Sequence, residues 1–336
     1  MCGIVGYIGE RQAAGILIEG LKRLEYRGYD SAGIAVATDK GLEVIKKKGK
    51  IKNLRSIVPP DLPGKCGIGH TRWATHGEVN DINAHPHTDG ANKIAIVHNG
   101  IIENYTTLKE KLKTEGYTFE TETDSEVIAS LISSNYQGCL EKAVRESVAL
   151  LKGTYGIACI HTDNPCKIVG ARNGSPLVLG IGHDEMFLAS DVTAMLAYTK
   201  QAIYLEDGEI VSITQDNFEI CDLWENVKSK SVELIGWELE EIEKSGYSHF
   251  MEKEIHEQSE SIQRAMRGRL DAELATGHLG GLNLTSKELL NIERVKILAA
   301  GTSSYAGLVG SYLMENLARI PCTVELSSEV RYKNPI

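Results

Sequence analysis

The sequence predicts an α+β protein in two parts: a strand-rich sandwich layered with helices, then the start of an α/β unit built on a parallel sheet. Three observations predict this. The chain has 336 residues, whereas a domain holds roughly 150. Residues 1–223 combine many short strand patterns with a few helical ones, and the strands stop in the acidic, polar stretch 224–247. A strand–helix–strand pattern then occupies 295–326.

The first part opens with an expected strand at 3–8 and a helix over 10–24. Apolar residues recur at helical spacing from Ile16 to Leu24, and Gly28 is the expected stop. Further strands are expected at short apolar runs flanked by turn residues: 33–38, 42–47, 94–98, 154–161, 167–171, 176–181, 186–190, 208–213 and 218–223. Helical patterns at 104–115, 125–135 and 140–151 interrupt them, the second opening at Asp124-Ser125 in the manner of an N-cap. Helices against strand-rich sheets predict a layered sandwich.

The second part begins with a helical stretch at 249–267 and a looser segment around Gly277–Gly281. A strand from Val295 then runs into the turn Gly301–Ser304, a helix at 304–318 and a strand at 321–326, which together make a βαβ unit with parallel strands. A doubly wound domain needs several more strands, so we expect the second domain to be incomplete at Ile336. The expected domains are 2–236 and 249–336, joined by a linker at 237–248.

Composition restricts the class of function. Acidic residues number 46 against 36 basic ones, a net charge of −10, which argues against a general nucleic-acid or anionic-membrane surface. Seven scattered cysteines with no Cys-x-x-Cys pair signal neither a disulfide framework nor a zinc site. The first residues lack the pattern of a secretory signal, and no apolar run approaches the roughly 18 residues that span a bilayer. We expect a cytoplasmic protein that acts on small molecules.

Cys2 is the most informative single residue. If Met1 is removed, a thiol and a free α-amine share one residue, and an amine with a pKa of roughly 7.7–8.0 can take the thiol proton near neutral pH. The alternative is that Cys2 is a small residue entering a strand, which position alone favours.

Three further motifs carry polar groups suited to a ligand. In His70–Gly77, Arg72 offers a guanidinium for a carboxylate, and Thr75 and His76 offer hydrogen bonds; a solvated surface loop remains the alternative. Asn99-Gly100 ends an apolar run and suits an oxyanion hole or a tight hairpin turn. Asp124 suits a substrate ammonium group or a helix cap.

Other motifs are weaker. Arg27-Gly28 reads as a helix end, and His85-x-His87 is slight evidence for a metal without a third ligand, so no metal is assigned. The turn Gly301–Ser304 offers hydroxyls and helix-terminal N–H groups to a phosphate, or is a plain turn of small residues. It lacks the Lys of an ATP-binding loop and the glycine spacing of a dinucleotide site.

Taken together, the motifs resemble a known family. The start Met1–Gly6, the block Leu24–Gly33, the block His70–Gly77 and His98-Asn99-Gly100 resemble the glutaminase domain of the glutamine:fructose-6-phosphate aminotransferases, which are class II amidotransferases. In the second part, His249–Gln258 resembles the first helix of that family's isomerase domain, and the turn Gly301–Ser304 resembles its first sugar-phosphate loop. The match covers the whole chain.

The resemblance implies a four-layer αββα sandwich of the N-terminal-nucleophile type, followed by an incomplete sugar isomerase domain. It implies removal of Met1 and attack of Cys2 on the side-chain amide of glutamine, releasing ammonia and then glutamate through a thioester. The implied roles are an oxyanion hole from Asn99 and Gly100, a grip on the amino-acid end of glutamine by Arg72, Thr75, His76 and Asp124, an ammonia gate at Trp73, a loop near the nucleophile with Arg27, and sugar-phosphate contacts from Thr302 and Ser303.

In that family ammonia passes to fructose 6-phosphate, giving glucosamine 6-phosphate without a bound cofactor, and the full-length protein is expected to be a homodimer. The rest of the family's sugar site would lie beyond Ile336, so this chain alone is expected to hydrolyse glutamine at most. The alternatives are another class II amidotransferase, a glutaminase-only or inert fragment, and a thiol hydrolase that uses His76 or His98 as its base.

Overall fold

The computed structural model describes residues 2–236, 246–266, 270–271, 276–277 and 285–333. The chain divides into two compact units between Lys253 and Glu254, and each is described by itself. The expected domain boundaries at 236 and 249 stay predictions, because 237–245 lies outside the described residues, as does most of the looser segment around Gly277–Gly281. Among the helices that the structure describes, none is both long enough and apolar enough to cross a bilayer.

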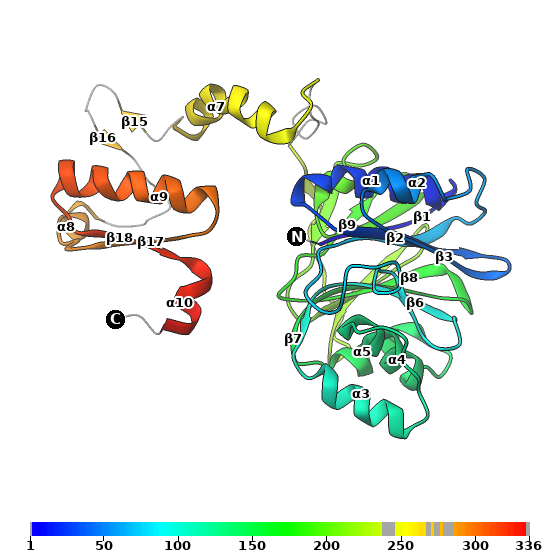
Figure 1. The fold of residues 1–336 in the computed structure, drawn as a ribbon. Helices are drawn as coiled ribbons and strands as arrows, with labels where there is room; N and C mark the ends of the chain where they lie inside the picture. Colours follow the sequence, from blue (N-terminus) through cyan, green and yellow to red (C-terminus); the bar gives the residue numbers. More distant parts are fainter. Residues whose placement is uncertain (1, 237–245, 267–269, 272–275, 278–284, 334–336) are drawn as a thin grey trace. The chain divides into compact units, whose positions relative to one another are not determined.

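Two antiparallel sheets form the centre of the first unit (Figure 1). Within the described residues, the first sheet has the order β14 (Glu233–Leu234), β11 (Gln201–Tyr204), β9 (Val178–Ile181), β10 (Glu185–Ala189), β1 (Gly3–Gly9), β4 (Cys66–Arg72), β2 (Ser31–Thr38) and β3 (Gly41–Lys48). The second has the order β13 (Phe218–Asp222), β12 (Glu209–Ile213), β8 (Asn164–Asn173), β7 (Gly153–His161), β6 (Ile94–Ile102) and β5 (His87–Thr88).

Apolar cores join these sheets into four layers. Helices α1 (Ala13–Arg23) and α2 (Ile51–Arg55) cover the outer face of the first sheet, and a second core that includes Ile4, Ile68 and Val97 fills the space between the sheets. Helices α4 (Asp124–Asn135) and α5 (Leu140–Val148) cover the second sheet, and α3 (Tyr105–Thr114) packs on α4 (Figure 1). The αββα order predicted from the sequence is confirmed.

Side-chain alternation along β1 shows how one strand serves two layers. Val5 and Tyr7 belong to the core beneath α1, whereas Ile4 and Ile8 belong to the core between the sheets. This is the two-residue period of a strand that is buried on both faces. Cys2 directly precedes β1, so the register of this strand decides where the thiol lies.

The longest strand that the sequence did not predict is β4, although it lies inside the first sheet. Its sequence, Cys-Gly-Ile-Gly-His-Thr-Arg, has two glycines and a polar end, both unusual in a strand. The glycines fit close packing: a Cβ at Gly67 would lie 2.7 Å from the carbonyl oxygen of Ala35. The short elements α2, β5, β11 and β14 were also missed, because they carry too few residues to show a period.

The second unit contains the predicted βαβ arrangement. Strand β17 (Val295–Ala299) pairs in parallel with β18 (Cys322–Leu326), and α9 (Thr302–Leu313) connects them and continues as a π-helical turn over Met314–Ala318. A capping box formed by Thr285 and Glu288 begins α8 (Ser286–Leu290). The remaining described elements are β15 (Leu270–Asp271), β16 (Thr276–Gly277) and α10 (Ser327–Lys333), and α7 (Phe250–Met266) spans the division between the units.

Candidate active site

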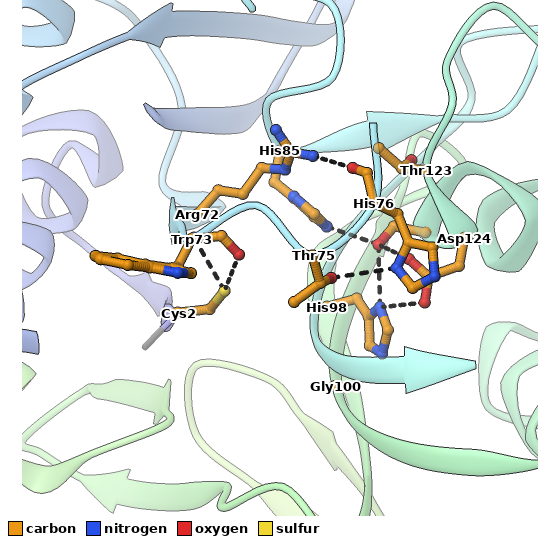
Figure 2. A pocket seen from close by; sticks show the side chains of 11 residues that line it. Cys2, Arg72, Trp73, Thr75, His76, His85, His98, Gly100, Thr123 and Asp124 are labelled. Carbon is orange, nitrogen blue, oxygen red and sulfur yellow. Dashed lines mark hydrogen bonds and ion pairs between the residues drawn. The ribbon is translucent and has the colours of Figure 1, made fainter. Parts of the chain in front are cut away.

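Cys2 lies at the edge of a pocket in the first unit (Figure 2). The backbone N–H of Trp73 donates to its Sγ at 3.2 Å, and Sγ lies 3.5 Å from the Trp73 carbonyl oxygen. Burial raises the pKa of the Cys2 thiol. The thiol is therefore neutral near pH 7 and needs a base to become a nucleophile.

A polar cluster holds the backbone of Cys2 in place. Arg27 donates from one guanidinium nitrogen to the Cys2 carbonyl oxygen at 3.4 Å and to Ser190 Oγ at 3.3 Å, and it forms a close ion pair with Asp191. Ser190 Oγ also accepts from the N–H of Ile4 at 3.0 Å. The structure thus places Arg27 beside the nucleophile. Its partners Ser190 and Asp191 were missed, because they follow β10, far away in the sequence.

Arg72 ends β4 and points into the same pocket (Figure 2). Its guanidinium is buried and donates to the carbonyl oxygens of His76 and, at 3.3 Å, Glu78. Asp30 fixes the backbone here: its N–H donates to the Arg72 carbonyl at 2.8 Å, and its carboxylate accepts from Ala74 N–H at 2.6 Å. The segment after β4 therefore curls around the guanidinium and brings its own polar side chains to the pocket.

That segment supplies Trp73, Thr75 and His76 to the pocket wall. Thr75 Oγ1 and His76 Nδ1 are 3.2 Å apart, and the Trp73 indole is 55% exposed. Gly28 has a φ of +75°, and a Cβ there would lie 2.9 Å from the indole ring, so this glycine admits the tryptophan.

Asn99 and Gly100 lie inside β6 and not at a hairpin turn. They pair with Gly156 and Tyr155 of β7, which rules out the turn that an Asn-Gly pair commonly forms. Asn99 Nδ2 donates to the Cys2 carbonyl oxygen at 3.4 Å, across the space between the two sheets. Gly100 has a φ of +131° and lines the pocket.

Asp124 is not the cap of its helix. Thr123 is the N-cap of α4, and its Oγ1 accepts from the N–H of Glu126 at 3.3 Å. This corrects the expectation of a cap at Asp124-Ser125, because the threonine one residue earlier has the extended backbone that a cap requires. The Asp124 carboxylate instead accepts from the N–H of Ile102 at 2.9 Å and lies in the pocket wall, 4.0 Å from His98 Nδ1.

The pocket combines opposite charges in a small space. Its lining residues are Cys2, Arg72, Trp73, Thr75, His76, His85, His98, Gly100, Thr123, Asp124 and Ser125. A thiol, a guanidinium and a carboxylate in one pocket suit a zwitterionic amino acid with an electrophilic group at its far end.

Of the remaining pocket residues, Thr123 and Ser125 had no predicted role in the site, whereas His85 was named only in a weak metal motif and His98 only as an alternative base. Ser125 Oγ lies 2.8 Å from His85 Nε2 and 3.0 Å from His98 Nδ1, and burial lowers the pKa of both histidines. The signals in the sequence were the pair His85-x-His87 and the motif His98-Asn99-Gly100. His87 Nε2 lies 3.2 Å from Thr123 Oγ1, and the described residues contain no cluster of three or more His, Cys, Asp or Glu side chains that could hold a metal.

Thr302 and Ser303 belong to the second unit. They open α9 after Gly301, whose φ is +59°, and both are exposed. Ser304 differs, since its Oγ donates back to the Gly301 carbonyl at 2.7 Å. The two exposed hydroxyls at the start of a 12-residue helix remain available to a ligand.

Comparisons with known proteins show which family the chain resembles. A family model described as the glutamine amidotransferase domain matches residues 70–197. The curated glutamine–fructose-6-phosphate aminotransferase of Caldanaerobacter subterraneus is 48% identical over 339 residues, and those of Thermus thermophilus and Methanosarcina mazei are 49% identical. All three alignments cover 100% of this chain. The chain belongs to this family. It spans about half of the curated relatives it matches, 55–56% of their length.

Solved structures extend the comparison to other amidotransferases. The allosteric regulatory enzyme of purine biosynthesis is 30% identical, with a TM-score of 0.58 over 67% of this chain and 50% of its own. The glutamine phosphoribosylpyrophosphate amidotransferase of B. subtilis is 22% identical, with a TM-score of 0.61 over 97% of this chain and 65% of its own, and shows the fold alone. The higher identity to the fructose-6-phosphate enzymes confirms the predicted family over the alternative of another class II amidotransferase.

Proposed function

We propose that the sandwich unit hydrolyses the side-chain amide of glutamine, with Cys2 as the nucleophile. The observation that carries this is the pocket itself: the thiol lies in one small cavity with the Arg72 cation and the Asp124 anion. Arg72 would bind the α-carboxylate of glutamine and Asp124 its α-ammonium group, with hydrogen bonds from Thr75 and His76. The side-chain amide would then face Cys2.

The α-amine of Cys2, free once Met1 is removed, would be the general base. It takes the thiol proton as Sγ bonds to the amide carbon, and it returns that proton to the leaving nitrogen, so that ammonia departs and a thioester remains. Water, deprotonated by the same amine, then hydrolyses the thioester to glutamate and restores the thiol. A base is required because burial raises the thiol pKa.

Asn99 and Gly100 would stabilise the negative charge that develops on the amide oxygen. The Asn99 NH₂ group already faces the Cys2 backbone at 3.4 Å, and Gly100 lines the same pocket. One such donor contributes about 10²–10³ to kcat in enzymes of this type. Arg27 would position the Cys2 backbone, and Trp73 would gate the passage of ammonia.

In the whole protein the ammonia would pass to fructose 6-phosphate to form glucosamine 6-phosphate; the names of the relatives give glutamine and fructose 6-phosphate as the substrates. Thr302 and Ser303 would contact the sugar phosphate, and the whole protein would be a cytoplasmic homodimer. The test is the full-length protein: Thr302→Ala with Ser303→Ala should raise KM for fructose 6-phosphate while glutamine hydrolysis stays unchanged. An unchanged KM would remove these residues from the sugar site.

Glutamate release from glutamine by this chain tests the first half of the proposal. We expect turnover in the wild type and in Cys139→Ala, a control at an exposed cysteine, and none in Cys2→Ala. A variant with one extra residue that is kept before Cys2 should also be inactive, because its α-amine is displaced. Activity in Cys2→Ala would end the proposal. If the extended variant is active and Cys2→Ala is not, the general base is a histidine such as His76 or His98 and not the α-amine.

A further inference from the structure

A fully buried histidine stands behind the Asn99 side chain. His70, on β4, is 0% exposed, and its Nε2 lies 2.9 Å from Asn99 Oδ1. It is not among the residues that line the pocket, so it does not meet a ligand there. The contact joins a strand of the first sheet to a strand of the second, at the level of the nucleophile.

The neighbours of Asn99 fix the direction of its amide. The Cys2 carbonyl oxygen can only accept a hydrogen bond, so the Asn99 group 3.4 Å from it is the NH₂ donor. Asn99 Oδ1 must then face His70 and accept from it. His70 consequently carries a proton on Nε2.

Burial also fixes the charge of His70. It lowers the pKa of this imidazole to about 3, so the ring is neutral at physiological pH and carries one proton, on Nε2. Nδ1 has no hydrogen-bond partner of good geometry among the described residues, and the nearby His98 backbone, which favours a protonated ring, offsets only part of the effect of burial on the pKa. The ring packs against His85 with centroids 4.2 Å apart, which restricts its rotation.

We propose that His70 is a positioning residue that holds the Asn99 amide with its NH₂ group toward the reacting carbonyl of the substrate. The inference rests on the proposed glutaminase function of Asn99. The O and N of an amide have nearly the same shape, so the side chain can turn over at low steric cost. Turned over, it would present an oxygen to the developing oxyanion and repel it. The His70 N–H stabilises only the productive orientation.

The first experiment compares three variants in glutamate release. We expect His70→Leu, which has no hydrogen-bond donor, to lower kcat about 10- to 100-fold. This loss should not exceed the loss caused by removing a whole oxyanion-hole donor. KM for glutamine should change less than about threefold, since Arg72 and Asp124 are untouched. His70→Gln retains an N–H donor and should recover at least part of kcat. Thr71→Val, the adjacent buried residue on β4, is the matched control and should retain wild-type kcat.

A double-mutant cycle separates positioning from a general structural role. In the Asn99→Ala background His70→Leu should cause no further loss of kcat, because there is no amide left to orient. Losses that multiply in the double variant would overturn the proposal. If His70→Leu does not fold, any loss of kcat that remains in His70→Gln should likewise disappear in the Asn99→Ala background, and a loss that persists there would overturn the proposal.

A spectroscopic measurement does not depend on turnover. Long-range ¹H–¹⁵N correlation spectra of the wild type should show His70 as a neutral ring protonated at Nε2 between pH 6 and 8. A proton on Nδ1, or a charged ring, would overturn the positioning role even if glutamine is hydrolysed. An inactive wild type or a fully active Asn99→Ala variant would refute the proposed function of Asn99, and with it the positioning role of His70. Wild-type kcat in His70→Leu would refute the positioning role alone.

Discussion

Gly100 is the position where a single methyl group should damage the site most. Its φ of +131° is a backbone conformation that L side chains rarely adopt, and a Cβ there would lie 2.0 Å from the Thr154 carbonyl oxygen and 2.6 Å from its carbon. Both atoms belong to the backbone of β7, which pairs with β6 on that side. The clash therefore cannot be relieved by the rotation of a side chain.

The cost of Gly100→Ala has two parts. A residue held in a disfavoured backbone conformation costs about 1–3 kcal/mol, and overpacking in a tight site costs about 1–3 kcal/mol more. The sum, about 2–6 kcal/mol, is a large share of the 5–15 kcal/mol that stabilises a typical domain. For a unit of this size it should lower Tm on the order of 10 °C.

Gly208→Ala separates the two parts. Gly208 has a φ of +84°, but a Cβ there would meet no atom within 4 Å. Gly208→Ala should therefore lose only the free energy of the disfavoured backbone conformation, and it should lower Tm by about half as much as Gly100→Ala. Calorimetry of the whole chain measures Tm, and the transition that both glycine variants shift belongs to the first unit. Equal shifts in Tm for the two variants would refute the steric argument.

Two further predictions concern stability. Burial alone would raise the pKa of Asp191, but hydrogen bonds from Thr193 N–H and Tyr26 and the charge of Arg27 lower this pKa overall. Asp191→Asn should therefore reduce the free energy of unfolding by about 1–3 kcal/mol at pH 7. The difference in Tm between wild type and variant should shrink as the pH falls below about 4 and the wild-type carboxylate gains a proton; a constant difference from pH 7 to 2.5 would contradict this. Thr71 Oγ1 is buried with no hydrogen-bond partner among the described residues, so Thr71→Val should stabilise the first unit by about 1 kcal/mol; a lower Tm would show that the hydroxyl is satisfied.

The sequence predicted the elements with a clear period and missed those whose pattern was set by packing. The helix that ends at Arg23 and the strands beside β7 showed their periods directly. Strand β4 showed no such period. Its Gly67 leaves room for the backbone of Ala35, and that contact joins segments far apart in the chain. Motif reasoning left Asn99-Gly100 open between a turn and an oxyanion hole, because only the pairing with β7 distinguishes them.

The histidines show the same limit from the chemical side. His85-x-His87 is a slight metal signal in the sequence, yet the partners of these rings are Ser125 and Thr123, at the start of a helix some forty residues later. The sequence carries no mark of that contact, because a histidine that accepts or donates a single hydrogen bond has no fixed spacing from its partner. Residues with obvious ligand chemistry can therefore be proposed from the sequence, whereas side chains such as Ser125 and Thr123, which hold the histidines, cannot.

The arrangement also explains why the fold needs two packed sheets to make one site. Cys2 precedes β1 in the first sheet, whereas Asn99 lies on β6 in the second, so the contact between them crosses the space between the sheets. Stacked sheets lie roughly 10 Å apart, a spacing that their apolar side chains set. Ile4, Ile68 and Val97 fill this space close in sequence to Cys2, His70 and Asn99. Because each polar residue of the site is a near neighbour, along its strand, of a residue in that core, the packing that stabilises the sandwich also sets the distance between thiol and amide.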